Sequence, residues 1–345
     1  MRVALLPYTL SPDEQHHVAN LCRSLTELDP SVSLERFDRG FPMRAAPADV
    51  IHVHWPEHVL DNRGVAKYLR PVRQLASIRW CRRRGAVVVH TAHNAAPHDH
   101  EPTRFGRWYL DAFDRSVDVV LASSEAGNDV LLAERPALQG ATFEFVPLGL
   151  PLWPVPTAID RLSACRRYGL DPTVPVVAFV GRVMRYKGID ALCEIWDPNT
   201  TQLLIAGAPD DAELAGEITT AVGGRPGARL DLRRLKESEL VDAVGAATVV
   251  VLPFVKILNS GSALLALSLG RRVLVPDLPT FRELRAELGE RWVHLFVGAR
   301  PSAEELARAL EDIPDGRPDL SAHEWSAVSG RTLAAYRSAI DRRSA

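Results

Sequence analysis

Residues 176–192 have the sequence VVAFVGRVMRYKGIDAL, and this stretch decides the fold. Its first five residues, 176–180, are all apolar, which predicts a strand buried on both faces of a sheet. Gly181 then permits a tight turn at the carboxyl edge of that sheet, where open α/β sheets bind ligands. A helical pattern follows over residues 187–195. The stretch therefore predicts a strand, a loop and a helix that belong to a parallel sheet.

The same alternation of short apolar runs and helical patterns occurs on both sides of residues 146–162. That segment contains four prolines, which predict a stiff linker. Strands are expected at residues 3–6, 50–54, 86–91, 117–122 and 143–147 before the linker, and at 176–180, 202–206, 228–232, 248–253 and 272–275 after it. Helices are expected at residues 13–28, 65–84, 106–114, 128–133, 187–195, 213–222, 237–245, 261–269, 303–312 and 324–337.

This order of elements predicts an α/β protein with two Rossmann-like parallel-sheet domains and a cleft between them. The first domain is expected at residues 1–150 and the second at residues 151–320. Residues 321–345 are expected to form a helix that packs back on the first domain. A chain of 345 residues is long enough for two such domains.

Charge and cysteine content exclude several classes of protein. Forty-one basic and 43 acidic side chains give a net charge of −2, which argues against a protein held to nucleic acid by bulk charge. The four cysteines form no close pair in sequence, so neither a disulfide framework nor a cysteine zinc site is expected. No apolar run is long enough for a signal peptide or a membrane span. We therefore expect a cytoplasmic protein.

Two basic residues follow the strand at 176–180. Arg182 and Lys187 lie five residues apart on one loop, beside the start of a helix. Arg can bind two oxygens of a diphosphate as a fork, Lys acts as a point charge, and the helix contributes backbone N–H groups. A solvated loop with ordinary basic residues explains the pattern equally well. Neither a Walker loop nor a dinucleotide fingerprint is present here.

The string GRVMRYKGIDAL resembles the G-R-x-x-x-x-K-G-x-x-x-L segment of GT-B-fold glycosyltransferases, and of family 4 in particular. In that family the Arg and the Lys hold the diphosphate of a nucleotide sugar, so the resemblance assigns this role to Arg182 and Lys187. It also implies a nucleotide-sugar donor bound by the second domain and an acceptor bound by the first. No cofactor is implied, because the nucleotide sugar is a substrate.

A second segment resembles the part of the family that receives the donor. Residues 249–276 read VVVLPFVKILNSGSALLALSLGRRVLVP, which predicts a strand, a polar loop and an apolar helix. Many members carry two glutamates here, at positions that correspond to Ile257 and Leu265, and this chain lacks both. Hydroxyls and free N–H groups are offered instead, and simple helix capping is the other explanation for them. The residues assigned to donor phosphate are Asn259, Ser260, Gly261 and Ser262, with Lys256 as a weaker candidate.

Histidines gather at the ends of two predicted strands of the first domain. Residues 49–62 read DVIHVHWPEHVLDN and residues 87–108 read VVVHTAHNAAPHDHEPTRFGRW, so these two segments hold seven of the 11 histidines. Clustering at strand ends favours a site. Loop packing and a metal site are the alternatives, and no metal is expected, since there is no His-Glu-x-x-His helix and the family needs none. The loops resemble those of bacterial exopolysaccharide transferases, including mannosyltransferases.

These loops supply the residues that we assign to the acceptor and to catalysis. The acceptor is assigned to His54, Trp55, Asn94 and His98. An inverting enzyme needs a base, and the candidates in order are Asp99, Glu57 and His93. A retaining enzyme needs none, and the sequence does not decide between them. The resemblance favours GDP-mannose as the donor, followed by UDP-sugars, and implies that the acceptor is a glycan, a lipid-linked molecule or a small molecule.

Two further hypotheses remain open at this stage. The chain is alternatively a GT-B-fold sugar-nucleotide epimerase, or a non-catalytic partner subunit of another transferase. The helix expected at residues 65–84 is rich in Arg and apolar residues, from which we infer weak contact with the inner face of a membrane; an ordinary amphipathic helix is the other explanation.

Overall fold

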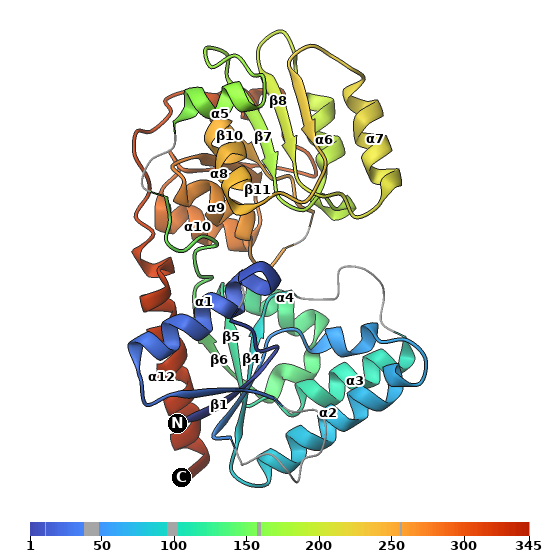
Figure 1. Cartoon of the computed structure of the whole chain (residues 1–345), viewed down its shortest axis with the longest axis vertical. Helices are drawn as coiled ribbons and strands as arrows, with labels where there is room; N and C mark the ends of the chain where they lie inside the picture. The colour runs from blue at the N-terminus through green and yellow to red at the C-terminus, as the bar shows by residue number, and fades with distance from the viewer. Residues whose placement is uncertain (11, 38–47, 95–102, 157–159, 256, 345) are drawn as a thin grey trace. The chain divides into compact units, whose positions relative to one another are not determined.

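The computed structural model describes the chain except residues 11, 38–47, 95–102, 157–159, 256 and 345 and the side chains of residues 12–16 (Figure 1). Contacts divide the chain into two compact units. Unit 1 comprises residues 1–149 and 321–345, and unit 2 comprises residues 150–320. Each unit is built around one parallel sheet of six strands. Within the described residues, no helix is long and apolar enough to cross a bilayer.

Unit 1 has the strand order β2-β1-β3-β4-β5-β6, and every pairing in its sheet is parallel. Buried valine, leucine and isoleucine side chains fill its central strands, as expected for a sheet covered on both faces. Its strands are β1 (Arg2–Leu6), β2 (Ser33–Arg36), β3 (Val50–Val53), β4 (Val87–Ala92), β5 (Val119–Ala122) and β6 (Thr142–Phe145). Its helices are α1 (Pro12–Leu28), α2 (Ala66–Arg82), α3 (Arg104–Asp114), α4 (Gly127–Glu134) and α12 (Trp325–Ser344), with 3-10 turns η1 (Pro56–Asp61), η2 (Pro136–Gly140) and η4 (Ser321–His323).

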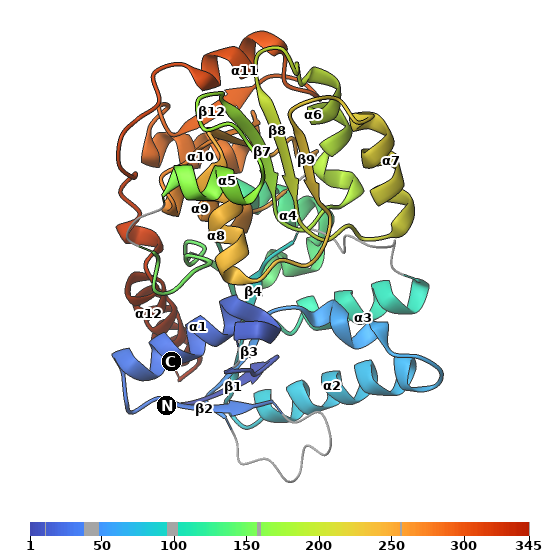
Figure 2. The same ribbon diagram turned by 45° about the horizontal axis from the view of Figure 1, so that its top comes forward.

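Unit 2 has the strand order β12-β11-β10-β7-β8-β9, again with parallel pairing throughout (Figure 2). Its strands are β7 (Val176–Val180), β8 (Gln202–Ala206), β9 (Ala228–Asp231), β10 (Val249–Val251), β11 (Arg272–Pro276) and β12 (Val293–Phe296). Its helices are α5 (Arg161–Arg167), α6 (Ile189–Ile195), α7 (Ala212–Val222), α8 (Glu237–Ala246), α9 (Gly261–Ser268), α10 (Pro279–Leu288) and α11 (Ala303–Leu310), with the 3-10 turn η3 (Arg185–Lys187).

The last helix of the chain, α12, belongs to unit 1 and packs against α1 and β4 (Figure 1). Trp325 begins it and is almost completely buried. The Ser24 hydroxyl donates a hydrogen bond to the Trp325 carbonyl over 2.9 Å. A Cβ on Gly149 would lie 2.5 Å from the Trp325 ring, so only glycine allows the chain to pass this close. Four of the elements are absent from the sequence prediction: β2, β12, α5 and α10.

Candidate functional site

The sheet of unit 2 has a topological switch point between β7 and β10. From β7 the chain proceeds outward through β8 and β9, and from β10 it proceeds in the opposite direction through β11 and β12. The loops that follow β7 and β10 therefore diverge at the carboxyl edge, and ligands of open α/β sheets bind in the crevice between such loops. Residues 181–188 follow β7 and residues 252–260 follow β10, so the two segments predicted to hold a diphosphate flank this position.

Backbone contacts join these two segments directly. The N–H of Val255 donates to the carbonyl of Tyr186 over 3.1 Å. A Cβ on Gly181 would lie 2.6 Å from the Ser262 hydroxyl, and a Cβ on Gly188 would lie 2.3 Å from the Pro253 carbonyl oxygen. Both glycines have positive φ, at 128° and 63°. The approach of the two loops therefore depends on glycine at both positions.

Gly188 permits a test with a matched control. Gly188 and Gly223 have nearly the same left-handed backbone, with φ of 63° and 59°, but a Cβ on Gly223 would meet nothing closer than 3.4 Å. We expect both alanine variants to lose stability from the backbone conformation, and Gly188→Ala to lose a further amount of about 1–3 kcal/mol from overpacking. Urea denaturation measures the difference. Equal losses in the two variants would contradict the close approach of the loops.

The basic side chains of this site differ in environment. Arg182 is exposed and pairs with Asp210 over 2.5 Å. Lys187 is 9% exposed, and its Nζ lies 5.8 Å and 5.7 Å from the ring centroids of Phe179 and Phe254. Burial, and next the positive charge of Arg182, lower the pKa of Lys187 to about 8, while Asp210 opposes this shift. An anion beside Lys187 would relieve both unfavourable effects, so the arrangement is suited to binding a diphosphate.

The segment after β10 places the start of α9 at the same location. Ser260 is the N-cap, and its hydroxyl accepts a hydrogen bond from Ala263 N over 3.1 Å. Its side chain is therefore used by the helix, which agrees with the capping explanation for this residue. Gly261 and Ser262 stand in the first turn, whose N–H groups have no acceptor inside a helix and are available to an anion. Lys256 lies outside the described residues.

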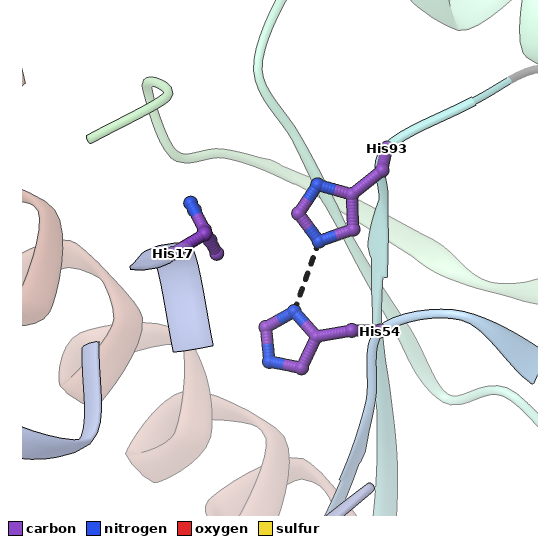
Figure 3. Close-up of side chains that lie close together, drawn as sticks. All are labelled: His17, His54 and His93. Atoms are coloured by element: carbon purple, nitrogen blue, oxygen red, sulfur yellow. Dashed lines mark hydrogen bonds between the residues drawn. The ribbon is translucent and has the colours of Figure 1, made fainter. Parts of the chain in front are cut away.

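The sheet of unit 1 has its switch point between β1 and β3, and β4 lies next to β3. His54 and Trp55 directly follow β3, and His93 and Asn94 directly follow β4. Figure 3 shows the result: His54 Nδ1 and His93 Nε2 share a hydrogen bond of 3.0 Å. The Trp55 ring stacks on the His93 ring, with 4.3 Å between centroids. These predicted residues therefore meet at one edge of the sheet.

A third histidine of this cluster, His17, is absent from the prediction. It comes from α1, and its ring centroid lies 4.9 Å from that of His93 and 5.7 Å from that of His54 (Figure 3). One feature of the sequence could have indicated His17: it lies in the helix that follows the first strand. That helix starts at the same edge of the sheet as the loops after β3 and β4. The ligand nitrogens of the three rings lie within 4.8 Å of one another. Binding of a Zn²⁺ ion by His54 Nδ1 and His93 Nε2 would break the hydrogen bond that these two nitrogens share, because both would then face the metal.

Two other histidines, His52 in β3 and His90 in β4, serve the fold. His90 Nδ1 donates to the Val53 carbonyl over 2.9 Å, and its Nε2 accepts from Arg135 over 2.9 Å. His52 contacts the Tyr336 hydroxyl through Nδ1 at 2.6 Å and the Thr91 hydroxyl through Nε2 at 2.7 Å. Both rings thus use both nitrogens inside unit 1. The packing explanation holds for these two, whereas His54 keeps a buried Nε2 with no hydrogen-bond partner among the described residues.

Burial makes all the clustered rings neutral at neutral pH. It is the main reason that the pKa values of His54 and His93 lie well below the usual range, and neighbouring histidines add to the effect. The pKa of His17 is lowered to about 4 and that of His52 to about 3, again mainly by burial. A neutral His93 can accept a proton but does so weakly.

These shifts predict that the protein loses stability in acid. Below about pH 6.5 the unfolded chain binds protons at its histidines while the buried rings of the folded chain do not, so stability decreases as the pH falls. For His52, with a folded pKa of about 3, the loss between pH 7.5 and pH 5 is about 2 kcal/mol. His52→Gln should reduce the pH dependence of the unfolding free energy by that amount. A His58→Gln variant, at an exposed position, serves as the control.

The remaining predicted residues are placed only in part. Glu57 lies in η1, just after Trp55, and burial raises the pKa of its carboxyl group while Arg135 opposes the shift. No described hydrogen bond or ion pair joins Glu57 to His93. Asp99 and His98 lie outside the described residues, so their roles remain predictions.

Comparison with known proteins supports the fold and the class of enzyme. No protein-family model matches the chain. The chain is 28% identical to the GDP-mannose:glycolipid 4-beta-D-mannosyltransferase of Xanthomonas campestris pv. campestris, over 98% of this chain and 93% of that protein. The chain is a glycosyltransferase of the GT-B fold. The relative is a transferase, which favours sugar transfer over the epimerase and partner-subunit hypotheses.

Two solved structures show the same fold over almost the whole chain. Sucrose-phosphate synthase from Thermosynechococcus elongatus has a TM-score of 0.63 at 16% identity, with 99% of this chain and 97% of that chain covered. Anabaena Alr3699/HepE in complex with UDP and glucose has a TM-score of 0.62 at 14% identity, with 99% and 98% covered. At such identities the likeness establishes the fold of this glycosyltransferase.

Proposed function

We propose that this glycosyltransferase moves a mannosyl residue from GDP-mannose to a glycolipid acceptor. The observation that carries the proposal is the meeting of residues 181–188 with the start of α9 at the switch point of unit 2. That meeting supplies buried and exposed cations together with helix N–H groups, a combination suited to a nucleoside diphosphate. The printed activity of the relative supports the choice of GDP-mannose and of a glycolipid.

The donor site would act on the leaving group. When the bond between the anomeric carbon and the diphosphate oxygen breaks, negative charge grows on that oxygen. Lys187, Arg182 and the first-turn N–H groups of α9 would stabilise this charge, and they are already in place before the reaction. Arg182 would exchange or share its Asp210 partner when the diphosphate binds. The chain's own cations thus do this work, and the proposal includes no cofactor and no metal ion.

The acceptor would bind at the sheet edge of unit 1. His54, Trp55, His93 and Asn94 converge there, and we assign His98 to the same role. A β-mannoside formed from an α-linked donor requires inversion, which agrees with the absence of the two glutamates at Ile257 and Leu265. Inversion needs a base for the acceptor hydroxyl, and we keep the order Asp99, Glu57, His93. The reaction is proposed to take place in the cytoplasm.

Donor choice is tested by thermal unfolding of the full chain with GDP-mannose, GDP, UDP-glucose and UDP. A ligand that binds only the folded state raises its stability by about 2.7 kcal/mol at 100 times its dissociation constant. We expect a clear shift with GDP and GDP-mannose and a smaller one with the uridine compounds. Transfer of labelled mannose to a lipid extract then tests the acceptor class. Stabilisation by UDP-glucose alone would overturn GDP-mannose, and no response to any nucleotide would overturn the donor site.

A further inference from the structure

Unit 2 contains a cavity of about 360 Å³ beside β12, an edge strand of its sheet. Helices α10 and α11 both contact β12 (Figure 2), and most of the lining comes from the ends of these helices and the starts of β11 and β12. Because the strands are parallel, the starts of β11 and β12 lie at the amino edge of the sheet, whereas the segments assigned to the donor lie at the carboxyl edge. None of the described lining residues belongs to residues 181–188 or 252–262. The cavity is therefore separate from the candidate donor site.

A buried arginine supplies positive charge at one wall of the cavity. Arg272, the first residue of β11, is 2% exposed. Its guanidinium group donates to main-chain carbonyls at the end of α11, those of Ala309, Glu311 and Asp312. These neutral partners hold the side chain in place, and it forms no ion pair with another described residue. Buried charges in proteins are normally paired, so an anion in the cavity would supply the counter-charge that Arg272 lacks.

Three further arginines line the cavity, and two of them have no acidic partner. Arg285, in the last turn of α10, pairs with Glu290. Arg291, in the loop before β12, and Arg308, in the last turn of α11, are exposed. Neither Arg291 nor Arg308 forms an ion pair with another described residue. Two exposed guanidinium groups are therefore available to a ligand.

Three further carboxylates line the same cavity. Glu305 is held by the start of α11, because it accepts hydrogen bonds from Ser302 N over 2.7 Å and from Val297 N over 2.9 Å. Glu311 and Asp312 follow α11, are exposed and form no ion pair with another described residue. Asp312 has a φ of 43°, a left-handed backbone that is uncommon for residues other than glycine. Two carboxylates are thus available beside the two exposed arginines.

The surroundings of His294, within β12, show that positive charge dominates this part of the cavity. Its Nε2 is buried and has no hydrogen-bond partner among the described residues. Burial lowers the pKa of the His294 ring, and the positive charges of Arg272 and Arg285 add to this shift, while Glu290 opposes it. Arg308 acts in the same direction as the other arginines. A neutral ring in a positive field is suited to a neighbouring anion.

We propose that this cavity binds a sugar phosphate. Arg291 and Arg308 would bind the phosphate oxygens, which match the fork of a guanidinium group, and the fixed charge of Arg272 would assist them. The carboxylates of Glu311 and Asp312 would accept hydrogen bonds from the sugar hydroxyls. The cavity volume lies at the lower end of the range for small-molecule sites, about 300–1,000 Å³. The inference goes beyond the proposed sugar transfer and does not depend on it.

The lining argues against two other classes of anion. A nucleobase binds best where an aromatic ring can stack on it, and the described lining includes no aromatic side chain other than His294. A bare phosphate ion would use the arginines but would leave the two free carboxylates close to its own negative charge. A ligand that combines one phosphate with several hydroxyls uses both kinds of side chain.

Calorimetric titration of the full chain in the presence of saturating GDP, which fills the donor site, tests the proposal. The probes are mannose 6-phosphate, inorganic phosphate and mannose, and we expect mannose 6-phosphate to bind most tightly. Arg291→Gln and Arg308→Gln should each lower its affinity about tenfold. The control is Arg166→Gln, at an exposed arginine in the last turn of α5, and it should not change binding. Because Arg166 and Arg308 both lie in a last turn, the effect of losing charge at a helix end is matched.

A further variant tests the contacts with the sugar hydroxyls. Asp312→Asn introduces a residue that tolerates the left-handed backbone, and it removes the negative charge. An amide oxygen accepts weaker hydrogen bonds from hydroxyls than a carboxylate does. The variant should therefore reduce the preference for mannose 6-phosphate over inorganic phosphate about fivefold.

Three outcomes would overturn the proposal. One is no binding of mannose 6-phosphate by a chain that still binds GDP, which would leave the proposed function intact. Another is unchanged affinity in both arginine variants, and the third is equal affinity for mannose 6-phosphate and inorganic phosphate. Thermal unfolding verifies that each variant folds, and if Arg308→Gln does not, Arg291→Gln in the loop carries the test alone. Binding of mannose 6-phosphate by a chain that fails to bind GDP would instead contradict the donor site alone.

Discussion

Lys187→Ala should weaken GDP binding and lower the rate of sugar transfer by about 10²–10³-fold, which corresponds to about 2.7–4 kcal/mol for one preorganised contact. The effect should be large because Lys187 is 9% exposed and its charge is poorly screened by water. Its pKa of about 8 adds a second readout, since the ammonium group is lost as the pH rises through that value. Affinity of the wild type for GDP should then decline above about pH 8, and the alanine variant should not show this decline.

Arg182 and Arg185 complete the experiment. The Arg182 side chain is 62% exposed and already paired with Asp210, so Arg182→Ala should cost about tenfold in GDP affinity, less than Lys187→Ala. Arg182→Lys should restore only part of the loss, because a point charge does not replace a fork. Arg185→Ala is the matched control, because Arg185 lies on the same loop but pairs with Glu213 and Glu217 of α7. Calorimetric titration measures all four variants. Wild-type affinity in Lys187→Ala would contradict the donor site.

Local signals were sufficient to predict most of the fold and to single out the two segments that meet at the switch point of unit 2. The bounds predicted for β7 and β8 agree with the structure because their apolar runs end abruptly at Gly181 and Gly207. The loop after β7 holds both candidate phosphate-binding cations, Arg182 and Lys187, within eight residues. Strands β2 and β12 were missed because both are short edge strands with partly exposed residues: SLER is mostly polar, and VHLF is an apolar run of only four residues that a histidine interrupts.

The sequence prediction missed the contacts of several histidines because their partners lie far away along the chain. The sequence showed that His52 and His90 sit at strand ends, but not that Tyr336, 284 positions away, would bind His52, or that Arg135 would bind His90. His17 comes from a helix whose orientation depends on packing against α12. Only tertiary packing separates the histidines that support the fold from the pair, His54 and His93, at the sheet edge.

Asp99→Asn should lower kcat by about 10²–10⁴-fold while leaving GDP affinity near that of the wild type, if Asp99 accepts the acceptor's proton. An amide has nearly the same shape as a carboxylate but cannot take up a proton, so the loss should fall on turnover rather than on donor binding. Asp129→Asn, at an exposed position of α4, is the control for a change of charge on unit 1. The pH profile of kcat in the wild type should show one ionisation that the Asp99→Asn variant lacks.

The other candidate bases make the result decisive. Glu57→Gln removes a carboxyl group whose pKa burial already raises, and His93→Asn removes a ring whose pKa burial lowers, so each would shift the pH profile in its own direction if it were the base. NMR of the product anomer gives the stereochemistry independently. A β product with full loss in Asp99→Asn supports inversion with Asp99 as base. An α product together with unchanged kcat in all three variants would show that the leaving phosphate takes the proton, so that the histidine edge of unit 1 serves acceptor binding alone.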